Sequence, residues 1–320
     1  MLIPHSIEHA GYRMRPIMTR VHCRPLSETT HEFLIAMLRE NLGRDWISEQ
    51  QRLPDTERHA VVQWLDQFDI VRSGGGIDAT TESAEYASAV ATGNIQALLC
   101  LAEDVVDLAH RGVLDPALLD RLRQPDQFQG VRYELAMAAV AVRSGLDIAW
   151  IAPTSAGKTP EFAATDPATG IQFDIEVKSR HRSGVLGHPG VPIDPEVTKP
   201  RVGRLLHDAR TKADGTRPFV ACIDLNLGPN RTRTDVHGWM DHVKHSFDQL
   251  PRPTPDEPDV VSGYLLTNFA YHYQGEDEMT DLGQSFLIVP EHVTCPIPME
   301  ILHRLREACR VYGALPPRQW

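Results

Sequence analysis

Two carboxylates and a lysine are predicted to meet in the middle of this 320-residue chain. Residues 171–178 alternate apolar and polar side chains, which is the pattern of a strand with one buried face. Glu176 and Lys178 therefore share the polar face of this strand, about 7 Å apart. Residues 161–165 form a second short strand, and the turn-forming residues 166–170 between the two strands predict a hairpin. Because opposed residues of a hairpin share a face, we expect Glu161 to lie beside Glu176.

This group of side chains is suited to hydrolysis with the help of a metal ion. Two neighbouring carboxylates repel each other, and a divalent cation such as Mg²⁺ or Mn²⁺ relieves that repulsion. A lysine next to the cation can orient or deprotonate a water molecule. Together these groups favour metal-dependent hydrolysis of a phosphodiester.

The order of these residues resembles the motif of the PD-(D/E)xK nuclease superfamily, which has the restriction-endonuclease-like fold. The motif is an acid after proline (here Glu161), a hairpin turn, and then Glu176-Val177-Lys178. Flanking residues resemble an uncharacterised bacterial branch of this superfamily, and the resemblance covers residues 126–290. It implies that Glu161 and Glu176 bind Mg²⁺ or Mn²⁺ with the Val177 carbonyl, and that Lys178 positions or activates the attacking water. The family usually has aspartate where this chain has Glu161, which moves one ligand by a methylene group.

A third acid, Glu134, lies on a helix predicted for residues 129–143. This helix has apolar residues on nearly every side, so it is expected to be buried. A buried carboxylate needs a partner. One interpretation is an ion pair with an arginine such as Arg132 or Arg143. The resemblance implies another, in which Glu134 holds a metal-bound water.

The expected substrate is nucleic acid, with DNA as the first candidate. The net charge of −11 argues against a nucleic-acid-binding protein, but the nine Lys/Arg and four Asp/Glu between Lys178 and Arg217 give this segment a local charge of +5. The arginines expected to contact phosphate are Arg180, Arg182, Arg204 and Arg210. The alternative for this basic segment is a solvated helix face.

Two other functions are consistent with the sequence. The first is a catalytically inactive member of the same fold that binds nucleic acid or protein. It is considered because this chain has Glu161 where the family usually has aspartate. The second is an ATPase, because residues 152–159 match a phosphate-binding loop whose lysine is Lys158. Against the ATPase, Pro160 follows at once, so no helix can begin where its amides would have to hold phosphate.

Composition indicates a protein of one large or two modest domains, cytoplasmic and without a membrane partner. No run of 18 apolar residues is present, the N-terminus has no apolar signal segment, and five scattered cysteines indicate a reducing compartment. A homodimer or a partner protein remains open.

The predicted elements give an α/β fold: a restriction-endonuclease-like mixed sheet flanked by helices, preceded by an all-helical region. Residues 1–28, interrupted by three prolines, are expected to form an irregular arm. Residues 29–123 are expected to form a helical domain or cap, with helices at 30–42, from 54, at 81–110 and at 116–122. The nuclease-like domain is expected to span residues 124–320.

Overall fold

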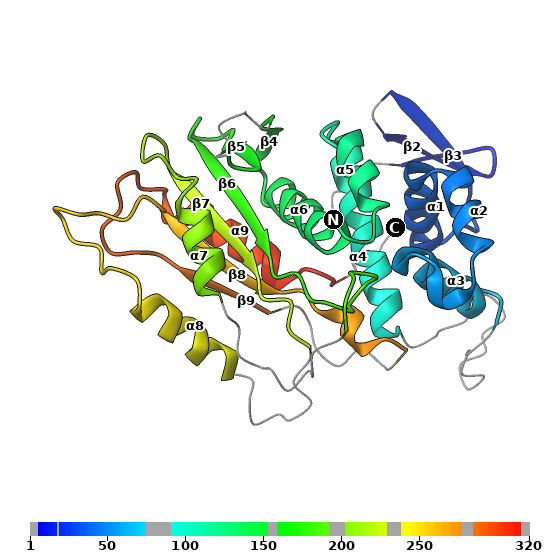
Figure 1. Cartoon of the computed structure of the whole chain (residues 1–320). Coiled ribbons are helices and arrows are strands. Elements are labelled where there is room, and N and C mark those ends of the chain that lie inside the picture. Colours follow the sequence, from blue (N-terminus) through cyan, green and yellow to red (C-terminus); the bar gives the residue numbers. More distant parts are fainter. Residues whose placement is uncertain are drawn as a thin grey trace.

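A computed structural model of the chain describes residues 6–17, 19–74, 91–152, 159–191, 202–228, 238–276 and 284–314. The protein is α/β, with a six-stranded mixed sheet, a separate three-stranded sheet, and helices between and around them (Figure 1). Within these ranges no helix combines the length and the apolar character needed to cross a membrane.

The prediction of an irregular arm followed by an all-helical N-terminal region is wrong. Strands β1 (Ile7–His9), β2 (Tyr12–Ile17) and β3 (Arg20–Pro25) form an antiparallel sheet in that order. Between β1 and β2, Ala10 and Gly11 both have positive φ angles, 50° and 81°, as a tight hairpin turn requires. Pro16 is tolerated because the described part of β1 pairs with residues 12–14 of β2, and no described residue pairs with Pro16 on that side.

Helices do make up the rest of the N-terminal half. They are α1 (Thr30–Leu42), α2 (Arg44–Gln51), α3 (Ala60–Arg72), α4 (Gly93–His110) and α5 (Pro116–Leu122), with a short 3₁₀ turn at Asp55–Glu57. The helices predicted at 30–42 and 116–122 are confirmed, whereas α2 was not predicted. Of the helix predicted over 81–110, the part from Gly93 onward is observed, and residues 75–90 lie outside the described ranges.

The large sheet has the order β4-β5-β6-β7-β8-β9. Its strands are β4 (Asp147–Trp150), β5 (Phe162–Thr165), β6 (Gln172–Ser179), β7 (Phe219–Asp224), β8 (Gly263–Asn268) and β9 (Gln284–Ile288). β6, β7 and β8 are parallel, and the other neighbouring pairs are antiparallel.

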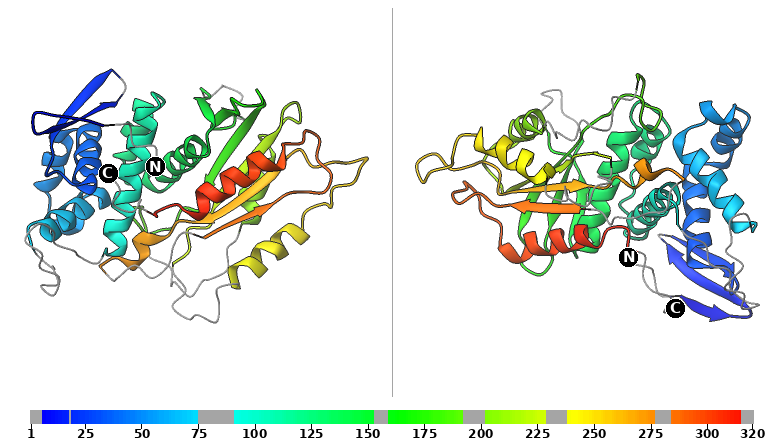
Figure 2. Two further views of the ribbon diagram at one scale, coloured as in Figure 1. Left: turned by 180° about the vertical axis from the view of Figure 1, so that it is seen from behind. Right: turned by 90° about the horizontal axis from the view of Figure 1, so that it is seen from below.

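Helices cover both faces of this sheet (Figure 2). α6 (Phe128–Arg143) packs against β4 and β6, and α9 (Met299–Arg310) packs against β8 and β9. On the opposite face lie α7 (Gly203–Arg210) and α8 (Gly238–Asp248). A 3₁₀ helix, η4 (Tyr271–Gln274), follows β8 and contacts α4.

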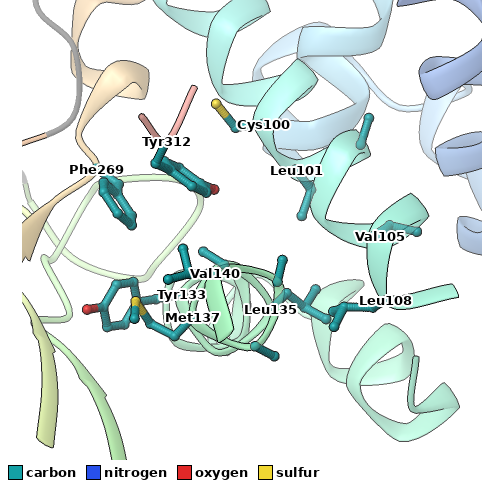
Figure 3. Close-up of a cluster of buried hydrophobic side chains, with 14 of the residues drawn as sticks. Cys100, Leu101, Val105, Leu108, Tyr133, Leu135, Met137, Val140, Phe269 and Tyr312 are labelled. Atoms are coloured by element: carbon teal, nitrogen blue, oxygen red, sulfur yellow. The ribbon is translucent and has the colours of Figure 1, made fainter. Parts of the chain in front are cut away.

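The largest hydrophobic core surrounds α6. Alternate residues of β6, Phe173, Ile175 and Val177, belong to this core. Side chains of α4, among them Leu101 and Val105, pack beside those of α6 (Figure 3). At its edge the rings of Phe269 and Tyr312 stack at 4.0 Å between centroids. Because the apolar residues of β6 face α6, its polar residues face the opposite side of the sheet.

The core between α4 and α6 also contains buried charges. Arg143 contacts Asp104 at 2.8 Å and Asp107 at 2.6 Å, and all three side chains are almost completely buried. The hydroxyl of Tyr312 donates a hydrogen bond to Asp104 at 2.7 Å. Burial raises the pKa of Asp104 to about 7, although Arg143 and this hydrogen bond oppose the rise.

This shift predicts that stability depends on pH. An unfolded aspartate has a pKa near 3.9, so between that pH and about 7 the folded protein retains a proton that the unfolded chain has released. The stabilising contribution of Asp104 is therefore present in mild acid and is lost as the pH rises through about 7. We expect the free energy of unfolding, measured with urea, to fall by about 2 kcal/mol between about pH 5.5 and about pH 8. Asp104→Asn should show a clearly smaller fall, and an unchanged pH profile in that variant would contradict this assignment.

Candidate active site

The hairpin formed by β5 and β6 places the two predicted acids opposite each other. Phe162 pairs with Ile175, so the next positions along the two strands are Glu161 and Glu176. The N–H of Glu161 donates to the carbonyl of Ile175 at 3.0 Å, which extends the pairing one residue past the end of β5. The predicted hairpin and its register are therefore confirmed.

Glu176 is the centre of the cluster. Its side chain is fully buried, and its Oε1 lies 2.6 Å from the Lys178 ammonium nitrogen. A second lysine, Lys212, lies 2.9 Å from the same oxygen and 3.6 Å from Oε1 of Glu161. One ammonium group thus bridges the two acids. Lys212 follows the C-terminus of α7, which packs on β6 and β7, and it was not among the predicted site residues.

Glu134 of α6 belongs to the same electrostatic group, but its direct partner is Arg121. The guanidinium of Arg121, on α5, donates two hydrogen bonds of 2.8 Å to the two carboxylate oxygens of Glu134. Neither Arg132 nor Arg143 is this partner, so that part of the interpretation is corrected. Glu134 nevertheless lies close enough to Glu161 to raise the pKa of the Glu161 carboxyl.

The pKa shifts reflect crowded acids and partial burial. Burial, followed by the charges of Glu134 and Glu176, raises the pKa of Glu161, and the two lysines oppose the rise. Burial also raises the pKa of Glu176. Burial lowers the pKa of Lys178, but the attraction and hydrogen bond of Glu176 outweigh it, so the pKa of Lys178 ends above its usual value. Lys178 is therefore a charged hydrogen-bond donor in this structure.

The donor set fits a hard divalent cation. Oε2 of Glu176 is buried and has no hydrogen-bond partner among the described residues. The carbonyl of Ile175 points toward β5, because it accepts the N–H of Glu161. Carbonyls two residues apart in a strand point to the same side, so the Val177 carbonyl also points to the side of β5, beyond the end of that strand. Among the described residues, no three His, Cys, Asp or Glu side chains are grouped as metal ligands. Between the carboxylates of Glu161 and Glu176 lies the ammonium group of Lys212.

The four arginines expected to contact phosphate lie in different environments. Arg204 is exposed, with 89% of its side chain accessible, and pairs with Asp208. Arg210 is committed to an ion pair with Asp259 at 2.5 Å and a hydrogen bond to the hydroxyl of Tyr264.

The other two arginines continue the line of β6. Arg180 and Arg182 follow directly after the strand, and the side chain of Arg182 is buried. Contact between nucleic acid and any of the four arginines stays a prediction. The rival phosphate-loop lysine, Lys158, lies among residues 153–158, outside the described ranges.

Comparison of the chain with protein-family models, with curated proteins and with solved structures gave no match. The geometry of the cluster therefore carries the functional interpretation. Its chemistry is defined by three carboxylates, two ammonium groups and one backbone carbonyl on neighbouring elements. Such a set can hold a divalent cation and orient a water molecule beside it.

Proposed function

We propose that the protein is a Mg²⁺- or Mn²⁺-dependent nuclease that hydrolyses phosphodiesters, with DNA as the expected substrate. The supporting observation is the register of β5 and β6, which sets Glu161 opposite Glu176 with Lys178 on the same face. The resemblance to PD-(D/E)xK nucleases is part of this proposal.

In the proposed mechanism, the acids hold the cation and the lysine positions the nucleophile. Glu161, Glu176 and the Val177 carbonyl would hold Mg²⁺ or Mn²⁺, which supplies Lewis-acid polarisation of a phosphoryl oxygen when it is bound. Lys178 keeps its proton, so it donates a hydrogen bond to the attacking water or to a phosphoryl oxygen. Glu134, oriented by Arg121, would accept a hydrogen bond from a water at the edge of the site.

Lys212 is expected to compete with the cation, because its ammonium already bridges Glu161 and Glu176. Replacing Lys212 with methionine removes a positive charge that the cation would otherwise displace or repel. We expect Lys212→Met to bind Mn²⁺ about 10-fold more tightly than the parent protein in a calorimetric titration. Unchanged or weaker Mn²⁺ binding would show that the lysine does not occupy the cation position.

The experiment that tests the function is incubation of plasmid DNA, single-stranded DNA and RNA with the protein. Each substrate is tested with Mn²⁺, with Mg²⁺, with Ca²⁺ and with a chelator. The proposal predicts cleavage with Mn²⁺ or Mg²⁺ that the chelator abolishes. A protein that binds Mn²⁺ and nucleic acid but cleaves none of the substrates would be the inactive binding module instead.

A further inference from the structure

A group of buried basic side chains lies just beyond the proposed active site, at the carboxyl ends of β6, β7 and β8. Arg132 comes from α6, Arg182 from the segment after β6, and His272 from η4. Their exposed fractions are 4%, 8% and 8%. None of the three has a role in the mechanism above.

Arg132 has fewer acceptors than its guanidinium can use. Its Nη1 donates to the carbonyl of Phe269 at 3.3 Å. Its Nη2 is 3.8 Å from Oδ2 of Asp224, beyond hydrogen-bond distance. Nε and Nη2 therefore have no hydrogen-bond partner among the described residues. Asp224 is itself engaged by the N–H groups of Asn226 and Phe269, so it cannot turn freely toward Arg132.

Arg182 and His272 show the same deficit beside a shared tyrosine. In the described part of the chain, Nη1 of Arg182 and both ring nitrogens of His272 lack hydrogen-bond partners. The guanidinium carbon of Arg182 is 5.9 Å from the centre of the Tyr273 ring, and the His272 ring is 4.4 Å from the same ring. The pKa of His272 is lowered by burial first, and then by the charges of Arg132 and Arg182. Both guanidinium groups therefore lie close enough to repel a proton on this imidazole.

The charges of this group do not balance. In the described part of the chain, the buried carboxylate of Asp224 is the one acid within 4 Å of the Arg132 guanidinium, and Arg182 has no acid within that distance. A buried charge without a partner and a buried donor without an acceptor both destabilise the folded protein. A bound oxyanion would supply both the negative charge and the missing acceptors.

We propose that Arg132, Arg182 and His272 form a binding site for the dianion of a phosphate monoester. Two guanidinium groups match the oxygens of a phosphate group, and the neutral imidazole supplies one further N–H donor. Because these donors are almost completely buried, the expected ligand is a free or a terminal phosphate and not an internal phosphodiester of a duplex. The source of the phosphate is either free phosphate or the phosphorylated end of the nucleic acid, and the second source rests on the proposed nuclease function.

The position of the site links it to the cleavage centre. Arg182 follows Lys178 by four residues, so the two Cα atoms are at most about 14 Å apart. A nucleic acid end held at Arg182 would therefore place a phosphodiester within a few nucleotides of Glu176 and Lys178.

The binding test uses inorganic phosphate as the probe and the full chain. We expect phosphate at millimolar concentration to raise the melting temperature of the parent protein above that in chloride of equal ionic strength. In a ³¹P NMR titration, Arg182→Gln should weaken phosphate binding about 10-fold or more because it removes a positive charge, and His272→Phe should do the same because it removes the ring N–H donor. The exposed Arg310→Gln variant is the matched control and should bind phosphate like the parent, because Arg310 lies on α9 and pairs with Glu307.

Two outcomes would overturn this site. One is that phosphate has no effect on the parent protein in either measurement. This outcome is measured on the parent protein alone and does not depend on whether a variant folds. The other is phosphate binding that Arg182→Gln and His272→Phe leave unchanged.

The source of the phosphate is tested separately with oligonucleotides that differ only in a 5′-phosphate, a 3′-phosphate or a terminal hydroxyl. A phosphorylated end as the ligand predicts that one phosphorylated form binds about 10-fold more tightly than the hydroxyl form, and that Arg182→Gln removes the difference. Equal binding of all forms, with phosphate binding intact, assigns the site to free phosphate. Glu176→Gln should keep phosphate binding, so loss of the nuclease function and loss of this site are distinguishable.

Discussion

Replacing Glu176 with glutamine is expected to lower the rate of nucleic acid cleavage by about 100-fold or more. Glutamine has nearly the same shape, but it lacks the charge that attracts a cation. In this structure Glu176 is fully buried and contacts two ammonium groups, so the loss affects the centre of the cluster. The measurement is the single-turnover cleavage rate of a labelled DNA in Mn²⁺.

The same experiment with Lys178 tests whether the two residues act together. Lys178→Met alone should also cost about 100-fold, and the double variant should be little worse than either single variant, because residues that act as a unit are not additive. Asp174→Asn is the matched control, since Asp174 lies on the same polar face of β6 and pairs with Arg217. Its rate should stay within about three-fold of the parent. A double variant that cleaves at the parent rate would exclude this mechanism.

The second large effect concerns stability. Arg143→Met is expected to lower the free energy of unfolding by about 3–5 kcal/mol, because it leaves the buried carboxylates of Asp104 and Asp107 without their cation. The measurement is equilibrium unfolding in urea at neutral pH. The loss should be smaller in mild acid, where Asp104 is protonated in both proteins and its carboxyl needs no cation.

An exposed arginine provides the control for this effect. Arg204→Met removes a guanidinium that is 89% accessible and pairs with Asp208 one turn away, so it should change the free energy of unfolding by less than about 0.5 kcal/mol. Equal effects of Arg143→Met and Arg204→Met would show that the buried ion pairs of α4 and α6 contribute no more than a surface pair.

The hairpin at the proposed active site could be predicted because its signals are local. Alternation along β6 assigns Glu176 and Lys178 to one face, and the turn at residues 166–170 fixes the register that brings Glu161 opposite Glu176. Lys212 could not be placed in this way. It joins the cluster through the crossover from β6 over α7 to β7, and spacing in sequence does not show which side chain such a helix brings to the strand.

The partner of Glu134 was missed for the same reason. Arg121 lies 13 residues earlier on α5, and only the packing of α5 against α6 brings the two side chains together. Arg210 was expected to face solvent and phosphate, but it pairs with Asp259, 49 residues away. Ion pairs between distant elements leave no periodic signal in the sequence.

The N-terminal sheet was missed although a local signal was present. Prolines at 16 and 25 were taken to break regular structure. Both are compatible with strands here, since Pro25 ends β3 and no described residue of β1 pairs with Pro16. The tight turn at Ala10-Gly11, followed by alternation over residues 12–17, would have indicated a hairpin.

The central claim is that Glu161 and Glu176 together hold a divalent cation. It is tested most directly by titrating the parent protein and Glu176→Gln with Mn²⁺ and measuring free Mn²⁺ by electron paramagnetic resonance. The expected result is one Mn²⁺ bound per parent chain, displaced by Mg²⁺, and binding weakened by about 100-fold or more in the variant. Equal Mn²⁺ binding by the two proteins, or none by the parent, would contradict the claim.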